Sequence, residues 1–178
     1  MKVRTAILAT LTAIAILALP STAVAESAAP RAAVATANLY RLYSGGAGDH
    51  FYTTNWSEAQ NAFNNLGYKY EGVAARVWPG SGAGRVSLYR LFHPGSGDHF
   101  YTTNWTEAQN AFNNLGYKYE GIAAYVRAGG GPGLVALYRL YHPGPSDHFY
   151  TTNWTEAQNA FNNLGYRYEG IAAYVLPA

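Results

Sequence analysis

The pattern of hydrophobic and polar positions repeats along the chain at a fixed spacing of 49 residues. The hexapeptide that starts at Asp49 recurs unchanged at Asp98 and again at Asp147. Repeats of this length form units that share a core with their neighbours, because one unit alone cannot bury its hydrophobic face. We therefore expect one repeat domain over residues 38–178, with units at 38–78, 87–127 and 136–176.

Each unit begins with a pattern typical of a β-hairpin. In the first unit, the aromatic and aliphatic run 39–43 predicts a strand, and the Ser-Gly-Gly sequence after it predicts a turn. Residues 50–54 are mostly aromatic or β-branched, so they predict a second strand that pairs with the first. The pattern over 68–77 predicts a third strand that closes the unit.

A helix is expected between the second and third strands. Asn55 precedes Glu58 by three positions, which is the spacing of a capping box at a helix start. Apolar residues then recur at i, i+3, i+4 and i+7, which predicts one apolar stripe along the helix. These residues are Ala59, Ala62, Phe63 and Leu66. Gly67 is a natural C-terminal stop.

These elements predict an α+β fold built from three β-β-α-β repeats in a compact pseudo-threefold arrangement around a common axis. The nearly identical copies argue against an open solenoid, since a solenoid normally carries atypical capping repeats at its ends. A β-trefoil-like fold is the alternative, because it also uses three units of similar length. The helix expected in each unit argues against it.

The N-terminal segment has the pattern of an export signal. Lys2 and Arg4 precede an apolar run and an Ala-x-Ala sequence that ends at Ala25, so residues 1–25 indicate a cleaved signal peptide. Residues 26–37, rich in Ala, Ser and Pro, are expected to form a disordered linker. Beyond the signal, no apolar stretch is long enough for a spanning helix. We expect an extracellular, monomeric protein that has no membrane anchor.

Composition and charge exclude several classes of protein. The chain is 49% hydrophobic, 15% aromatic and 12% charged, which is not typical of a disordered or highly charged chain. Loss of Lys2 and Arg4 with the signal leaves equal numbers of basic and acidic side chains, so no nucleic-acid partner is indicated. Because the chain has no cysteine, the fold has no disulfides and depends on its packed core.

Three segments of each unit resemble a known family of repeats. They are Leu-Tyr-Arg-Leu-Tyr at 39–43, Gly-Asp-His-Phe-Tyr-Thr-Thr at 48–54, and Gly-Tyr-Lys-Tyr-Glu-Gly-Ile-Ala-Ala-Tyr-Val at 116–126. The family is a domain of unknown function in secreted bacterial and fungal proteins, where it often accompanies extracellular hydrolases or cell-wall enzymes. The resemblance implies an extracellular accessory or binding module, and it brings no catalytic residues.

The repeated Asp-His pair is the first candidate for chemistry. Neighbouring residues on a strand point to opposite faces, so Asp49 and His50 are poorly placed to act on one substrate. We expect Asp49 to close the hairpin turn and His50 to form hydrogen bonds across strands. A second interpretation has three histidines converging on the axis to hold zinc. They are His50, His99 and His148. We predict no metal site, no cofactor and no catalytic residue.

Charged residues of opposite sign recur within each unit. Arg41 lies in the first strand and Glu71 in the closing strand, and their copies are Arg90 with Glu120 and Arg139 with Glu169. Because a partly buried guanidinium needs a partner, we expect one Arg-Glu ion pair in each repeat.

Aromatic residues next to polar ones indicate a binding site. If Trp56 at the helix start is exposed rather than in the core, it forms a platform for the apolar face of a sugar ring, while neighbouring Asp and Asn bind hydroxyls. The expected ligand-binding residues of the three copies are Asp49, Tyr52, Asn55, Trp56, Asp98, Tyr101, Asn104, Trp105, Asp147, Tyr150, Asn153 and Trp154.

The sequence therefore favours a secreted, non-catalytic module that binds carbohydrate or a cell-wall polymer through three equivalent weak sites. One alternative is a secreted hydrolase that depends on a metal or on carboxylates, for which the repeated His and Asp residues are the candidates. The other alternative is a structural or interaction protein whose repeats serve stability.

Overall fold

The computed structural model describes residues 34–178, which form one compact unit of the chain. The expected signal peptide, 1–25, and residues 26–33 of the expected linker lie outside the described residues. The first strand begins at Ala37, the last residue assigned to the linker. No helix within the described part of the chain is both long enough and apolar enough to cross a lipid bilayer.

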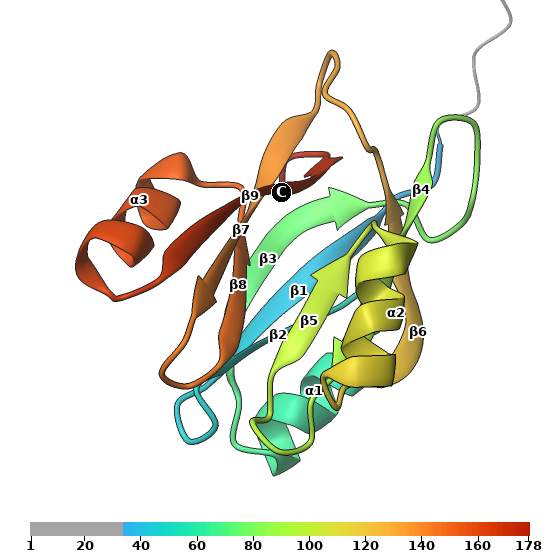
Figure 1. Cartoon of the computed structure of the whole chain (residues 1–178). Coiled ribbons are helices and arrows are strands. Elements are labelled where there is room, and N and C mark those ends of the chain that lie inside the picture. The colour runs from blue at the N-terminus through green and yellow to red at the C-terminus, as the bar shows by residue number, and fades with distance from the viewer. Residues whose placement is uncertain (1–33) are drawn as a thin grey trace, which may run out of the picture. The chain divides into compact units, whose positions relative to one another are not determined.

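Each unit follows the predicted order of strand, strand, helix and strand (Figure 1). The first unit contains β1 (Ala37–Ser44), β2 (Asp49–Thr53), α1 (Trp56–Asn65) and β3 (Lys69–Val77). The second contains β4 (Val86–Phe92), β5 (His99–Thr102), α2 (Trp105–Asn114) and β6 (Lys118–Val126). The third contains β7 (Val135–His142), β8 (Asp147–Thr151), α3 (Trp154–Asn163) and β9 (Arg167–Val175).

Every unit has its own three-stranded antiparallel sheet, with the first strand in the centre. The strand orders are β2-β1-β3, β5-β4-β6 and β8-β7-β9. The ends of the closing strands meet only through isolated backbone bridges, such as the one between Trp78 and Tyr125. The predicted β-β-α-β architecture is confirmed. The trefoil-like alternative is wrong, because the three sheets stay separate and do not close into a barrel.

The helices start where the sequence predicts. The side chain of Asn55 accepts hydrogen bonds from the backbone N–H groups of Ser57 and Glu58, which caps α1. Gly67, just after the helix, has φ of 77°, a conformation that glycine adopts without strain. Ala59 and Ala62 are buried, whereas Leu66 at the end of the stripe is exposed. The apolar stripe therefore packs against the sheet only over its first two turns.

The buried residues form one central core and three smaller ones. The central core receives equivalent residues from each unit, and Leu39, Tyr52, Ala75 and Val77 are the contribution of the first. Between α1 and its sheet, Leu42 and Phe51 pack with the helix alanines in a separate cluster, and the other two units repeat this arrangement. The sheet of each unit thus has one face in the shared core and one face under its own helix.

Three tyrosines close a ring of hydrogen bonds in the central core. The hydroxyl of Tyr101 accepts the backbone N–H of Tyr52 at 2.8 Å and donates to the carbonyl of Tyr52 at 2.7 Å. Tyr150 binds the backbone of Tyr101 in the same way, and Tyr52 binds that of Tyr150. Their rings meet edge to face, with centroids 5.5 Å apart. Each hydroxyl therefore satisfies both backbone groups of an edge-strand residue in the preceding unit around the ring.

Removal of one of these hydroxyls should destabilise the whole domain. Tyr101→Phe leaves the buried N–H and C=O of Tyr52 without partners, and we expect a loss of about 2–4 kcal/mol in the free energy of unfolding. Urea titration followed by tryptophan fluorescence measures this loss. Tyr119→Phe, which removes an exposed hydroxyl, is the matched control and should change little. Equal effects of the two substitutions would contradict the role of the ring.

Candidate functional site

The structure separates the residues that the sequence assigns to one binding site. Asp49 and Tyr52 are each 1% exposed, whereas Asn55 is exposed and Trp56 is 41% exposed. The other two units repeat this division. The platform of Trp56 with Asp49 and Tyr52 is therefore not assembled, because the aspartate and tyrosine belong to the interior between the units. Only the tryptophan and the asparagine reach solvent.

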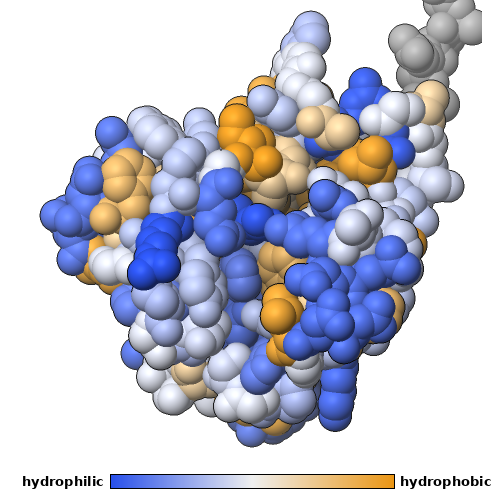
Figure 2. All heavy atoms as spheres, in the orientation of Figure 1, coloured by the Kyte–Doolittle hydropathy of each residue, from blue (hydrophilic) through white to orange (hydrophobic). Residues whose placement is uncertain are grey.

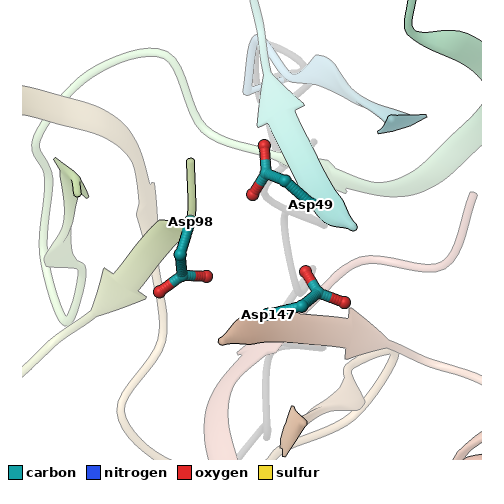
Figure 3. A group of neighbouring side chains, drawn as sticks. All are labelled: Asp49, Asp98 and Asp147. Carbon is teal, nitrogen blue, oxygen red and sulfur yellow. The ribbon is translucent and has the colours of Figure 1, made fainter. Parts of the chain in front are cut away.

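The three aspartates meet where the units join. Figure 3 shows the carboxylates of Asp49, Asp98 and Asp147 arranged around a common centre, and oxygens from all three lie within 4.8 Å of each other. Oδ1 of Asp49 accepts the backbone N–H of His99 at 2.8 Å, and Oδ2 lies 2.7 Å from Nδ1 of that histidine. The Tyr68 hydroxyl donates to the same Oδ2 at 2.6 Å. The same contacts link Asp98 to His148, and Asp147 to His50.

The close approach of the three aspartates is explained by the hydrogen bonds that their carboxylates accept. Both oxygens of each carboxylate already accept from a neighbouring unit, so a cation would have to displace several donors. Each histidine is held by an aspartate through its Nδ1. Among residues 34–178, the three aspartates are the one group of potential metal ligands that lie close enough together to share an ion. The cluster acts as a hub that ties each unit to the next.

An arginine in each junction between units joins two glutamates. Arg90 forms a bidentate pair with Glu58 of the first unit, at 2.9 and 3.1 Å, and its Nε lies 2.8 Å from Glu120 of its own unit. Its guanidinium also stacks over the ring of Phe51, 5.3 Å from the centroid. The predicted ion pair within each repeat is confirmed, and the pair between units adds to it. Arg41 and Arg139 make the equivalent contacts.

Glu58 does not complete the expected capping box. Its carboxylate accepts the hydroxyl of Thr53 and pairs with Arg90, while the backbone N–H of Asn55 donates to Thr53 instead. Burial alone would raise the pKa of Glu58, but the hydrogen bonds from Arg90 and Thr53 outweigh it and hold the pKa below the usual carboxyl range. Glu107 and Glu156 have lowered pKa values for the same reason. All three glutamates are therefore ionised near neutral pH.

Beside each arginine the surface is hollowed by a small polar pocket. The pocket between the first and second units holds about 260 Å³ and is lined by Thr53, Asn55 and Glu58 from one unit and by Arg90 and Glu120 from the other. The two other junctions contain equivalent pockets of about 260 and 270 Å³. The threefold repeat thus presents three matching polar pockets.

A second repeated feature is a group of aromatic rings beside each helix, in which a tryptophan and a tyrosine are exposed and two further rings are partly buried; we call it the outer cluster. In the first unit, the ring of Trp56 lies 4.9 Å from that of Tyr40 and 5.5 Å from that of Tyr70, and it also contacts Phe63. Tyr70 is 43% exposed. The equivalents are Trp105 with Tyr89, Tyr119 and Phe112, and Trp154 with Tyr138, Tyr168 and Phe161.

A comparison with protein families matches residues 37–176 to the domain of unknown function DUF5648. The chain belongs to the DUF5648 family. The match covers all three units, so the DUF5648 domain comprises the whole of the described fold apart from its last and first few residues. No curated protein and no solved structure matches the chain. The match agrees with the expected resemblance to a domain of unknown function, and it assigns no activity.

The sequence pattern gave little indication of the contacts between units. The spacing predicts the pair of Arg41 with Glu71, but it contains no signal for the pair of Arg41 with Glu156 or for the contact of Tyr68 with Asp49. The one available signal was the repeat itself. The charged and hydrogen-bonding residues recur in every unit, so an acidic side chain in one unit can bind the arginine or histidine of the next. Exposed Tyr70 was likewise not distinguished from the many other tyrosines.

The lowered glutamate pKa values predict how the stability of the DUF5648 domain depends on pH. Because the folded-state pKa lies below the ordinary value of 4.5, the stabilisation is complete above that pH and is lost as the pH falls through the folded-state pKa. The urea concentration at the midpoint of unfolding should therefore decrease as the pH is lowered from about 5 to about 3. In the triple variant Glu58→Gln, Glu107→Gln and Glu156→Gln, stability near neutral pH should be lower and this acid dependence shallower.

The matched control replaces exposed residues of the same helices, with Gln60→Ala, Gln109→Ala and Gln158→Ala. It should keep the acid dependence of the unmodified protein. An acid dependence as steep in the glutamate variant as in the control would mean that other groups carry it.

Proposed function

We propose that this protein is a secreted, non-catalytic module that binds a neutral carbohydrate or cell-wall polymer through its three outer clusters. The observation that carries the proposal is the exposure of a tryptophan and a tyrosine side by side in every unit. Trp56, Trp105 and Trp154 are each 41% exposed, and the neighbouring Tyr70, Tyr119 and Tyr168 are 42–43% exposed. Large aromatic side chains left in water at three equivalent positions favour a binding role over a purely structural one.

The geometry of the outer cluster suits a sugar ring. The rings of Trp56 and Tyr70 are inclined at 79° to one another, which leaves an apolar face beside a phenolic hydroxyl. The apolar C–H face of a sugar packs on such a ring, while polar groups at its edge bind the hydroxyls. Gln60 is exposed one helical turn after Trp56 and supplies an amide on the same side of α1.

The charge distribution favours a neutral ligand at these clusters. Every acidic side chain within residues 34–178 belongs to the junction networks described above. The exposed face of α1 is uncharged, with Gln60, Asn61, Asn64 and Asn65 on its surface. On the side of the molecule shown in Figure 2, hydrophobic residues form small separate patches among polar ones. Hydroxyl-rich partners match this amide-rich surface better than charged ones do.

The state of the glutamates supports the non-catalytic part of the proposal. Glycoside hydrolysis normally needs one carboxyl group that remains protonated near neutral pH. Glu58 and its two equivalents have lowered pKa values and are held by arginine, so they are poor proton donors. The Asp-His pairs also lack a nucleophile, since within residues 34–178 none of their three hydrogen-bond networks contains an unpartnered hydroxyl or thiol.

Binding should depend on several outer clusters at once. Three weak sites on one rigid body gain affinity for a polymer because the first contact raises the effective concentration of the others. A short oligosaccharide that reaches only one cluster should therefore bind much more weakly than the insoluble polymer.

Trp105→Ala should lower the apparent affinity for the bound polymer about tenfold, because one of three linked contacts is lost. The melting temperature should fall by only about 2–4 °C, since the side chain is partly exposed. Retention on insoluble chitin, cellulose and peptidoglycan measures binding, and calorimetry measures stability. The triple variant Trp56→Ala, Trp105→Ala and Trp154→Ala should no longer be retained.

Leu115→Ala is the matched control, because Leu115 is an exposed apolar residue just after the same helix and lies outside the outer cluster. It should leave retention unchanged. If the unmodified protein stays in the supernatant with every polymer, or if the triple tryptophan variant is still retained, the proposal is wrong. A structural or interaction role would then be favoured.

A further inference from the structure

The junction between the first and second units contains a second cavity, which shares Glu58, Arg90 and Glu120 with the polar pocket. This junction cavity holds about 290 Å³ and lies between the inner side of α1 and the sheet of the second unit. Phe51 and Leu66 line it from the first unit, and Phe92 and His99 line it from the second. Glu58 and Glu120 add carboxylates to the same walls. Its volume is close to the lower end of the range for small-molecule sites.

The junction cavity breaks the threefold equivalence of the units. Between the third and first units the corresponding cavity holds about 200 Å³ and is lined by the equivalents of the same residues, with one exception. Phe92 lines the larger cavity, whereas Tyr43 stands at the equivalent position of the first unit and does not line the smaller one. Tyr141 occupies this position in the third unit. The linings of the larger and the smaller cavity thus differ at one position, which is Phe92 in the second unit and Tyr43 in the first.

The walls of the junction cavity combine aromatic rings with an excess of hydrogen-bond acceptors. The ring of His99 lies between those of Phe51 and Phe92, at centroid distances of 4.7 and 4.8 Å. Nδ1 of His99 is held by Asp49, and within residues 34–178 Nε2 has no hydrogen-bond partner. Arg90 binds Oε2 of Glu120, and Oε1 accepts no hydrogen bond from the described residues.

The charges on these walls do not cancel. Glu58 and Glu120 share the single guanidinium of Arg90, so the cavity carries one formal negative charge in excess when His99 is neutral. A guest that fits therefore has an apolar body for the aromatic rings and a positively charged donor for the carboxylates. An acidic guest would be repelled by the same carboxylates.

We propose that the junction cavity between the first and second units binds a small amphipathic amine, with one molecule bound per chain. The ammonium group of the amine donates to Glu120 and the apolar body packs among Phe51, Phe92 and His99. The aromatic rings add a favourable interaction with the cation. This site is separate from the outer cluster, because the contacts of Trp56 and those of Glu58 lie on different sides of α1.

Three probes with the same aromatic ring test the proposal: phenethylamine, 2-phenylethanol and phenylacetate. Titration calorimetry of the whole protein should give one phenethylamine site per chain with a dissociation constant of about 1 mM, as expected for a ligand of this size. 2-Phenylethanol should bind about tenfold more weakly and phenylacetate should not bind measurably. Chemical-shift changes at the backbone amides of Phe92 and His99 locate the site.

Phe92→Tyr is the decisive variant, since tyrosine already occupies this position in the other two units and the fold accepts it. It should weaken phenethylamine binding about tenfold by reducing the cavity toward the smaller volume found between the third and first units, and it should leave polymer retention unchanged. Glu120→Gln should remove the preference for the amine over the alcohol. Tyr43→Phe should add a second amine site.

Several results would overturn the proposal. They are no binding of phenethylamine, equal binding of all three probes, three amine sites in the unmodified protein, or undiminished binding in Phe92→Tyr. Because polymer retention is measured separately, failure of the amine site and failure of the outer clusters can be told apart.

Discussion

The fold depends on how three edge strands meet in the interior of one domain. β2, β5 and β8 each lie at the edge of a sheet, and each presents backbone groups that no further strand covers. Buried backbone groups must find partners, because leaving them unpaired costs more than most single contacts contribute. Tyr52, Tyr101 and Tyr150 solve this with hydroxyls that both accept and donate. Burial raises the pKa of each phenol, so the proton needed for donation is retained.

The charged layer follows from the same arrangement. Because the edge strands face one another, the first side chain of each edge strand faces the neighbouring unit. The helix that follows the strand faces the same unit. Asp49 can therefore bind the backbone and the ring of His99, and Glu58 can bind Arg90. Within residues 34–178 no buried side-chain nitrogen or oxygen lacks a partner. At the junctions, the buried polar side chains thus all have hydrogen-bond partners and surround a small apolar centre. Because each pair fits in one position, the units pack against one another in one relative position.

The sequence was sufficient to predict the order of elements, the helix start at Asn55 and the pairing of Arg41 with Glu71. These features depend on contacts within one unit, where spacing along the chain determines distance. The position of Tyr52 could not be predicted, because its hydroxyl binds the backbone of Tyr150 in the third unit, which the local pattern does not describe. Trp56 and Tyr52 are both aromatic and only four positions apart, yet one is exposed and the other is buried. That difference arises from the packing of three units together.

The contacts between units run head to tail, from the helix side of one unit to the sheet of the next, and the third unit contacts the first through the same side chains. Heterologous contacts of this kind either close into a ring or continue as a filament. Here they close after three copies, and the backbone bridge between Arg76 and Leu176 joins the last strand to the first unit. Within residues 34–178, the helix glutamate of each unit is thus paired with the arginine of another unit. The described fold is in this sense a closed assembly of three covalently linked units, so chain ends placed in either linker between the units would leave the junction contacts in place.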